Sequence, residues 1–150
     1  MILTIPWIVV AIILYNLIAF TVDAPDPIIL ADGTQLARTA FDRQIFDVRM
    51  VSGADWTLTV GALVTIITLV LLFVELIKAT RTGGSSIVDH ALSTILFVFC
   101  LVEFLLVPQA ATSVFFFILV VTLIDVIAGF SITIRAARRD FGFAGGGGMD

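Results

Sequence analysis

A chain of 150 residues that is 60% hydrophobic and only 13% charged has the composition of a membrane protein, because soluble domains carry far more charge. The single cysteine, Cys100, cannot form a disulfide within one chain, which excludes the paired-cysteine, quinone-linked thiol oxidases that also use four membrane helices. The single histidine, His90, cannot supply two axial ligands to a haem, which excludes a haem-carrying cytochrome subunit. The net charge of −4 is confined to a few connecting segments and gives no indication of nucleic-acid binding.

Four apolar segments are each long enough to cross a hydrocarbon core about 30 Å thick. They cover residues 2–22, 57–79, 87–107 and 112–134. No Lys or Arg precedes the first segment and no small-x-small cleavage site follows it, so we interpret it as a retained anchor and not as a signal peptide. We therefore predict an all-α polytopic membrane protein, an antiparallel bundle of four transmembrane helices over residues 1–134.

The connection over residues 23–56 is long and polar, with six aspartates against three arginines. Asp32 and Gly33, between two apolar stretches, predict a hairpin closed by a type I′ turn. Further on, Phe46 and Val48 alternate with polar residues as in a half-buried strand, although one helical face would fit as well. We expect a structured loop that forms a lid over the outer mouth of the bundle, with a partner-docking surface as the alternative.

Positively charged residues near the ends of the predicted helices favour one orientation in the membrane. Five of them fall on the same side when four helices alternate: Lys78, Arg81, Arg135, Arg138 and Arg139. Such residues prefer the cytoplasm and the lipid headgroups there, so both termini are predicted to be cytoplasmic and the acidic loop extracytoplasmic. The compact loops suit a bacterial inner membrane. Residues 135–150, basic and then glycine-rich, are predicted to be a flexible tail, and Trp7 and Trp56 to be interfacial anchors.

Polar and small residues follow one face of each of the last three predicted helices. The residues that we place in this intramembrane network are Thr68, Glu75, His90, Thr122 and Asp125, with Glu103 and Asn16 as secondary members. Glycine and threonine on such a face more often serve packing than function. Glu103, close to a helix end, is expected to snorkel to the surface or to cap against Gln109.

Asp125 lies deepest, about 14 Å from the nearer end of its helix at 1.5 Å per residue. Placing an ionised carboxylate at that depth in the bilayer costs several kcal/mol, so a functional role is the default hypothesis for such a residue. In one interpretation it stays neutral and donates its proton to a threonine hydroxyl or to Asn16 as interhelical glue, which we favour. In the other, a wetted path runs from Asp125 through Glu75 and His90 to the cytoplasm.

No catalytic set or cofactor site is predicted. Asp89 and His90 are adjacent on a helix and point about 100° apart, so they cannot form a dyad, and His90 with Glu75 and Asp125 would make a weak metal site. The size invites comparison with the small multidrug transporters, but the first predicted helix lacks their glutamate. We therefore expect a non-enzymatic structural or accessory protein that interacts with the bilayer, with other membrane proteins or with copies of itself. The alternative is a proton- or cation-linked transport subunit that uses Asp125, Glu75 and His90.

Overall fold

The computed structural model describes residues 5–80 and 86–144, without the side chains at 86–87, 133 and 135–144. The protein is mostly helical, with 66% of its residues in helices. The elements in chain order are α1 (Ile8–Thr21), β1 (Ile28–Ile29), β2 (Gln35–Leu36), the short 3₁₀ helix η2 (Ala40–Asp42), β3 (Gln44–Arg49), β4 (Asp55–Thr59), α2 (Val60–Ala79), α3 (Ser86–Leu106), the 3₁₀ helix η3 (Pro108–Ala110) and α4 (Ser113–Ala144).

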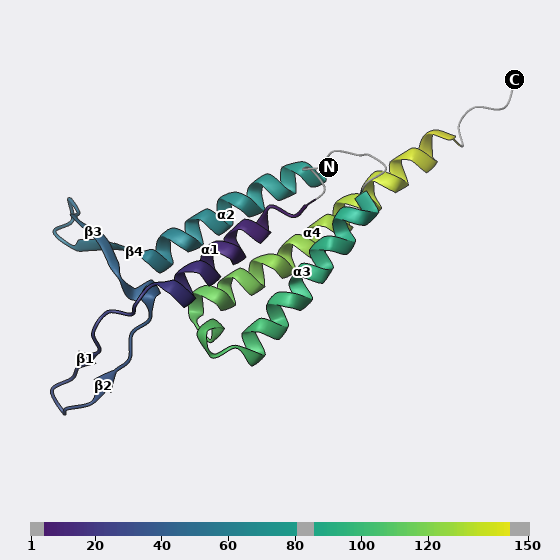
Figure 1. The fold of residues 1–150 in the computed structure, drawn as a ribbon. Helices are drawn as coiled ribbons and strands as arrows, with labels where there is room; N and C mark the ends of the chain where they lie inside the picture. Colours follow the sequence, from purple (N-terminus) through teal and green to yellow (C-terminus); the bar gives the residue numbers. More distant parts are fainter. Residues whose placement is uncertain (1–4, 81–85, 145–150) are drawn as a thin grey trace, which may run out of the picture.

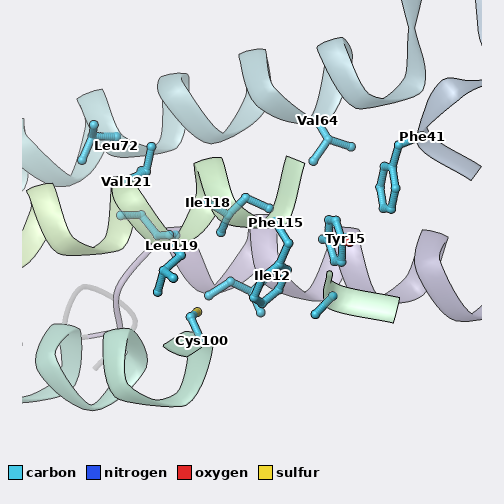
Figure 2. Close-up of a cluster of buried hydrophobic side chains, with 12 residues drawn as sticks. Ile12, Tyr15, Phe41, Val64, Leu72, Cys100, Phe115, Ile118, Leu119 and Val121 are labelled. Carbon is cyan, nitrogen blue, oxygen red and sulfur yellow. The ribbon is translucent and has the colours of Figure 1, made fainter. Parts of the chain in front are cut away.

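The helices run alongside one another, and both hairpins lie at the same end of them as η3 (Figure 1). Helix α4 packs against α2 and α3, while α1 packs mainly against α2. Apolar side chains of all four helices meet between them (Figure 2). The most deeply buried of these include Ile8, Tyr15, Val64, Cys100, Phe115, Ile118 and Val121.

Within the described residues, three helices are long and apolar enough to cross a membrane. These spans are Val60–Ala79, Val88–Leu106 and Ser113–Ile132. They agree with the predicted helices to within a few residues, because a continuous apolar run of that length leaves few alternatives. Outward-facing Leu, Val, Ile and Phe side chains cover all three.

The first helix is shorter than the segment predicted over residues 2–22. Helix α1 begins at Ile8 and has 14 residues, about 21 Å at 1.5 Å per residue. The prediction ran through Pro6, whose ring disfavours helical geometry in the residue before it. Residues 1–4 of the prediction lie outside the described chain.

Helix α4 continues to Ala144, past the point at which the flexible tail was predicted to begin. Alanines and arginines after Ile134 are good helix formers, and no proline interrupts them. A basic segment after an apolar run can therefore extend the helix and need not end it.

Two antiparallel hairpins, β1–β2 and β3–β4, make up most of the loop between α1 and α2. Both close with a three-residue loop whose last member is a glycine at positive φ, Gly33 at 81° and Gly53 at 85°. This geometry corrects the predicted type I′ turn, because Asp32 does not have positive φ. The second turn, Val51–Gly53, was not predicted, although its glycine carries the same signal.

The hairpins do not form the predicted lid. Nearly every residue of their strands is exposed, and they project beyond the ends of the helices (Figure 1). Only η2 folds back, where Ala40 and Phe41 are buried against α1 and α2. Gly61 makes this approach possible, since a Cβ there would lie 2.9 Å from Val114 Cγ2 and 3.2 Å from the Phe41 carbonyl oxygen.

Candidate functional site

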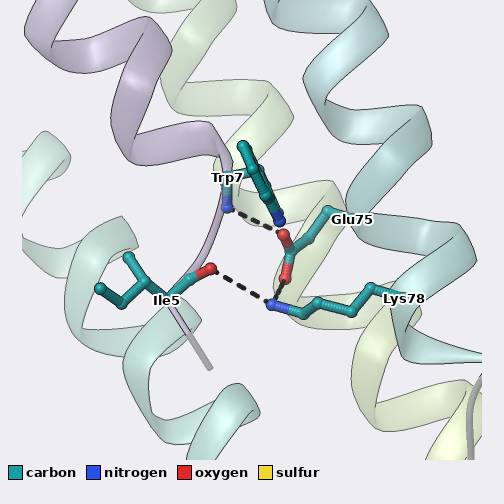
Figure 3. Close-up of polar contacts among 4 residues, drawn as sticks. All are labelled: Ile5, Trp7, Glu75 and Lys78. Carbon is teal, nitrogen blue, oxygen red and sulfur yellow. Dashed lines mark hydrogen bonds and ion pairs between the residues drawn. The ribbon is translucent and has the colours of Figure 1, made fainter. Parts of the chain in front are cut away.

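Glu75 holds the start of α1. Its Oε2 accepts the backbone N–H of Trp7 at 2.9 Å, and its Oε1 pairs with Lys78 Nζ at 2.6 Å (Figure 3). Lys78 also donates to the Ile5 carbonyl at 3.3 Å. The first N–H groups of a helix have no partner within it, and a carboxylate there complements the helix dipole. Two side chains of α2 thus clamp the first turn of α1.

Asp125 joins α4 to α3. Its carboxyl group forms a side-chain hydrogen bond with Ser93, and both residues are at most 5% exposed. Asp125 also interacts electrostatically with Glu75 and Lys78. The deepest acid of the predicted network therefore lies near the clamp, but its bonded partner is Ser93 and neither a threonine nor Asn16.

His90 packs against the backbone of α4. Its ring lies next to Gly129, where a Cβ would come within 2.6 Å of His90 Nδ1, and its centroid is 5.3 Å from that of Phe130. His90 is 7% exposed. The glycine on the polar face of α4 is therefore the recess that accommodates the imidazole.

Two buried threonines of the predicted network bond to their own helices. Thr68 Oγ1 donates to the Val64 carbonyl at 2.8 Å, and Thr122 Oγ1 donates to that of Leu119 at 2.7 Å. A threonine hydroxyl within a helix can reach the carbonyl one turn back, which satisfies it without an interhelical partner. These residues line the contact between helices without linking them through hydrogen bonds.

At the opposite end, Tyr15 fixes α1 to the connection between α3 and α4. Its hydroxyl donates to the Gln109 carbonyl at 2.9 Å and lies 2.6 Å from Thr112 Oγ1, which caps α4 by accepting from Phe115 N. The ring stacks on Phe41 with centroids 4.4 Å apart and meets Phe115 edge-on at 4.8 Å. The sequence pattern did not indicate that Tyr15 anchors α1 or that Phe41 is its partner.

Glu103 and Asn16 are less well bonded. Glu103 is 8% exposed, so its side chain does not snorkel, and the described residues show no hydrogen bond between Glu103 and Gln109. Among the described residues, Glu103 Oε2 and Asn16 Oδ1 are buried without a hydrogen-bond partner. The helix on which Glu103 lies turns this carboxyl inward, toward Tyr15 and Cys100.

Two open grooves flank Phe41 at the hairpin end, with volumes of about 510 and 400 Å³. They share Thr39, Phe41, Ala111 and Thr112 as walls. Residues with hydroxyl groups line the larger groove: Thr39 just before η2, Thr65 on α2, and Thr112 and Ser113 at the start of α4. No titratable residue of the predicted network lines either groove, so the grooves and the network are separate features.

Of the five basic side chains predicted to contact headgroups, the structure describes only that of Lys78. Lys78 is engaged in the clamp, which turns its ammonium group toward α1. Arg81 lies outside the described residues, as do the side chains of Arg135, Arg138 and Arg139. Over the described part of the chain, no group of three or more His, Cys, Asp or Glu is placed to hold a metal ion.

No protein-family model matches the chain, and comparison with curated proteins and with solved structures yields no match either.

Proposed function

We propose that the protein is a non-enzymatic, four-span integral membrane protein that serves as an accessory or assembly component for other membrane proteins. Helix α1 would be the fourth span. At about 21 Å it is shorter than the hydrocarbon core, a mismatch that a bilayer accommodates by thinning locally. Its outward-facing Val10, Ile13, Leu17 and Phe20 are suited to contact lipid.

The observation that carries the proposal is the engagement of the intramembrane polar groups. Glu75 caps α1, Asp125 bonds Ser93 on α3, and His90 fills the recess at Gly129. Each contact joins two helices, and in a membrane such contacts replace the hydrophobic drive for association that lipid does not supply. Thr68 and Thr122 add close packing without a bond between helices. The polar residues are thus used to hold the helices together.

The second candidate is a proton- or cation-linked transport subunit, which the nearness of Asp125 to Glu75 and Lys78 favours. In that case Asp125 would exchange its proton through Glu75 and His90. The clamp counts against this path, because both oxygens of Glu75 already have partners. Moving a proton through Glu75 would release the first turn of α1.

Substitution of Asp125 separates the two candidates. The protein is reconstituted in liposomes as wild type, Asp125→Asn and Asp125→Leu, and both proton flux and resistance to unfolding are measured. The proposed function expects Asp125→Asn to resemble wild type in both assays, since an amide can still bond Ser93, and Asp125→Leu to be destabilised. A wild-type proton flux that Asp125→Asn abolishes without loss of stability would establish the transport function instead.

A further inference from the structure

The β3–β4 hairpin has one apolar and one polar face. The register pairs Phe46 with Leu58 and Val48 with Trp56, and residues directly opposite in a ladder share a face. The alternate pairs, Asp47 with Thr57 and Arg49 with Asp55, lie on the other face. The hairpin is therefore amphipathic.

The apolar face is largely uncovered. Phe46, Val48 and Trp56 are 46%, 41% and 48% exposed, and only Leu58, at the base, is buried. Phe46 and Trp56 contact each other edge-on with centroids 6.1 Å apart. A single two-stranded hairpin is marginally stable in water without something against its hydrophobic face. These three side chains have the composition of an interface core, in which aromatic residues are enriched.

The apolar face of the hairpin extends too far from the hydrocarbon core to be covered by lipid. Strand β4 leads directly into α2, whose 20 residues, about 30 Å, match the hydrocarbon core. At about 3.3 Å per residue, Trp56 stands about 13 Å along the strand from Val60. The headgroup region is only about 5–8 Å thick on each side, so the face extends beyond it.

The negative charge of the loop between α1 and α2 favours a basic partner. All six aspartates of the loop are exposed. Two of its three arginines are bound to backbone carbonyls of the loop, Arg38 to that of Asp42 and Arg43 to that of Asp23. The negative surface repels anionic lipid and a second copy of the same loop, and it attracts basic groups.

We propose that the apolar face of the β3–β4 hairpin (Phe46, Val48 and Trp56) docks a protein outside the membrane whose apolar surface is bordered by lysines or arginines. This inference rests on the proposed function, because it names the surface through which an accessory protein would hold its partner. It concerns the hairpin alone and makes no use of Asp125 or Glu75.

The test uses Trp56 as a reporter. In the full-length Trp7→Phe protein, placed in phosphatidylcholine nanodiscs, Trp56 is the remaining tryptophan. The probe is a short peptide of alternating lysine and valine, with a glutamate–valine peptide as its charge control. We expect a saturable blue shift of Trp56 emission with the lysine peptide only, and weaker binding as salt is raised.

Matched variants on the two faces of one hairpin test the geometry. Val48→Asn should weaken binding about tenfold or more, as loss of an interface contact does, and Thr57→Asn should leave it unchanged. Asp55→Asn leaves the apolar face intact and should reduce the salt dependence of binding. This variant tests the inference even if the hairpin of Val48→Asn unfolds.

Four results would overturn the inference. One is equal binding of both peptides, and another is an equal loss of binding in Val48→Asn and Thr57→Asn. The third is quenching of Trp56 by spin-labelled lipid without peptide, which would mean that lipid covers the face. The fourth is a two-copy complex that Val48→Asn dissolves, which would make the occupant a second copy. Because none of these readouts involves Asp125, such a failure would leave the proposed function to its own flux and stability assays.

Discussion

Helix α1 is held at its start and midway along its length by different chemistry. At its start, the charged pair of Glu75 and Lys78 takes up backbone groups of Trp7 and Ile5. Midway along the helix, Tyr15 is held by ring stacking and by neutral hydrogen bonds to Gln109 and Thr112. A helix of 14 residues that is apolar on every side has little in its own pattern to fix its position, so side chains from other elements fix it at these two points.

The aromatic contact at Tyr15 should be the stronger of the two. Tyr15→Ala removes a ring that is fully buried between Phe41 and Phe115, and we expect a loss of about 3–5 kcal/mol in the free energy of unfolding. Tyr15→Phe keeps the rings together and leaves the Gln109 carbonyl without its donor, with an expected loss of about 1–3 kcal/mol. Unfolding in mixed detergent micelles measures both. Equal losses in the two variants would show that the hydroxyl group of Tyr15, and not its ring, holds α1 here.

The charged contact at the start of α1 should contribute less to the free energy of unfolding. Glu75→Leu removes the cap of α1 and leaves Lys78 without its counter-ion, at an expected cost of about 2–3 kcal/mol in the same assay. Glu75→Gln keeps an acceptor for the Trp7 N–H and should cost less. Hydrogen exchange at the Trp7 amide gives a local readout, with exchange faster in Glu75→Leu than in Glu75→Gln. Unchanged exchange in the leucine variant would contradict the clamp.

One glycine on α2 and one on α4 each allow a close approach between elements. Gly61→Ala would push against Val114 and Phe41, and Gly129→Ala would push against the His90 ring, each costing about 1–3 kcal/mol. Second substitutions that shorten the obstructing side chain, Val114→Ala and His90→Ala respectively, should relieve part of the strain. The two double-mutant cycles measure this coupling, and strictly additive losses would refute the proposed contacts.

The smallest effect is expected at Asp32, which lies in water, away from both ends of α1. The Thr34 N–H, 2.9 Å from Asp32 Oδ1, favours the ionised form and holds the pKa of Asp32 below its usual 3.8. Because the pKa is lowered in the folded turn, this contribution is present above the usual value and is lost as the pH falls through the lowered one. The Thr34 amide resonance should titrate with a midpoint below 3.8, and Asp32→Asn should abolish the transition. A midpoint at or above the usual value would show that the Thr34 N–H does not stabilise the ionised form of Asp32.

Prediction from sequence succeeded where a pattern is local. The three long helices follow from apolar runs, and the first hairpin follows from Asp32 and Gly33. The start of α1 could be predicted only in part, because Pro6 marks it while its stabilising cap comes from Glu75, 68 residues away. The exposure of the hairpins was missed because alternation indicates an amphipathic strand without showing whether anything covers its apolar face.

The site could be predicted as a set of residues but not as a set of bonds. Ser93 lies on the predicted polar face of its helix, yet helical periodicity does not tell whether a serine on α3 or a threonine on α2 meets Asp125. Likewise, Glu75 and His90 share a level along the helices, but one faces α1 and the other α4. The rotation of each helix about its axis, which packing decides, separates these outcomes.

The most direct test of the central claim, that the buried polar groups hold the helices together, is infrared difference spectroscopy of Asp125 in bilayers, with Asp125→Asn to assign its carboxyl band. We expect a band that is unchanged between about pH 5 and pH 9 and that shifts when Ser93→Ala removes the hydrogen bond. A band that titrates in this range, and that moves when Glu75 or His90 is replaced, would contradict the account and establish a connected path for protons.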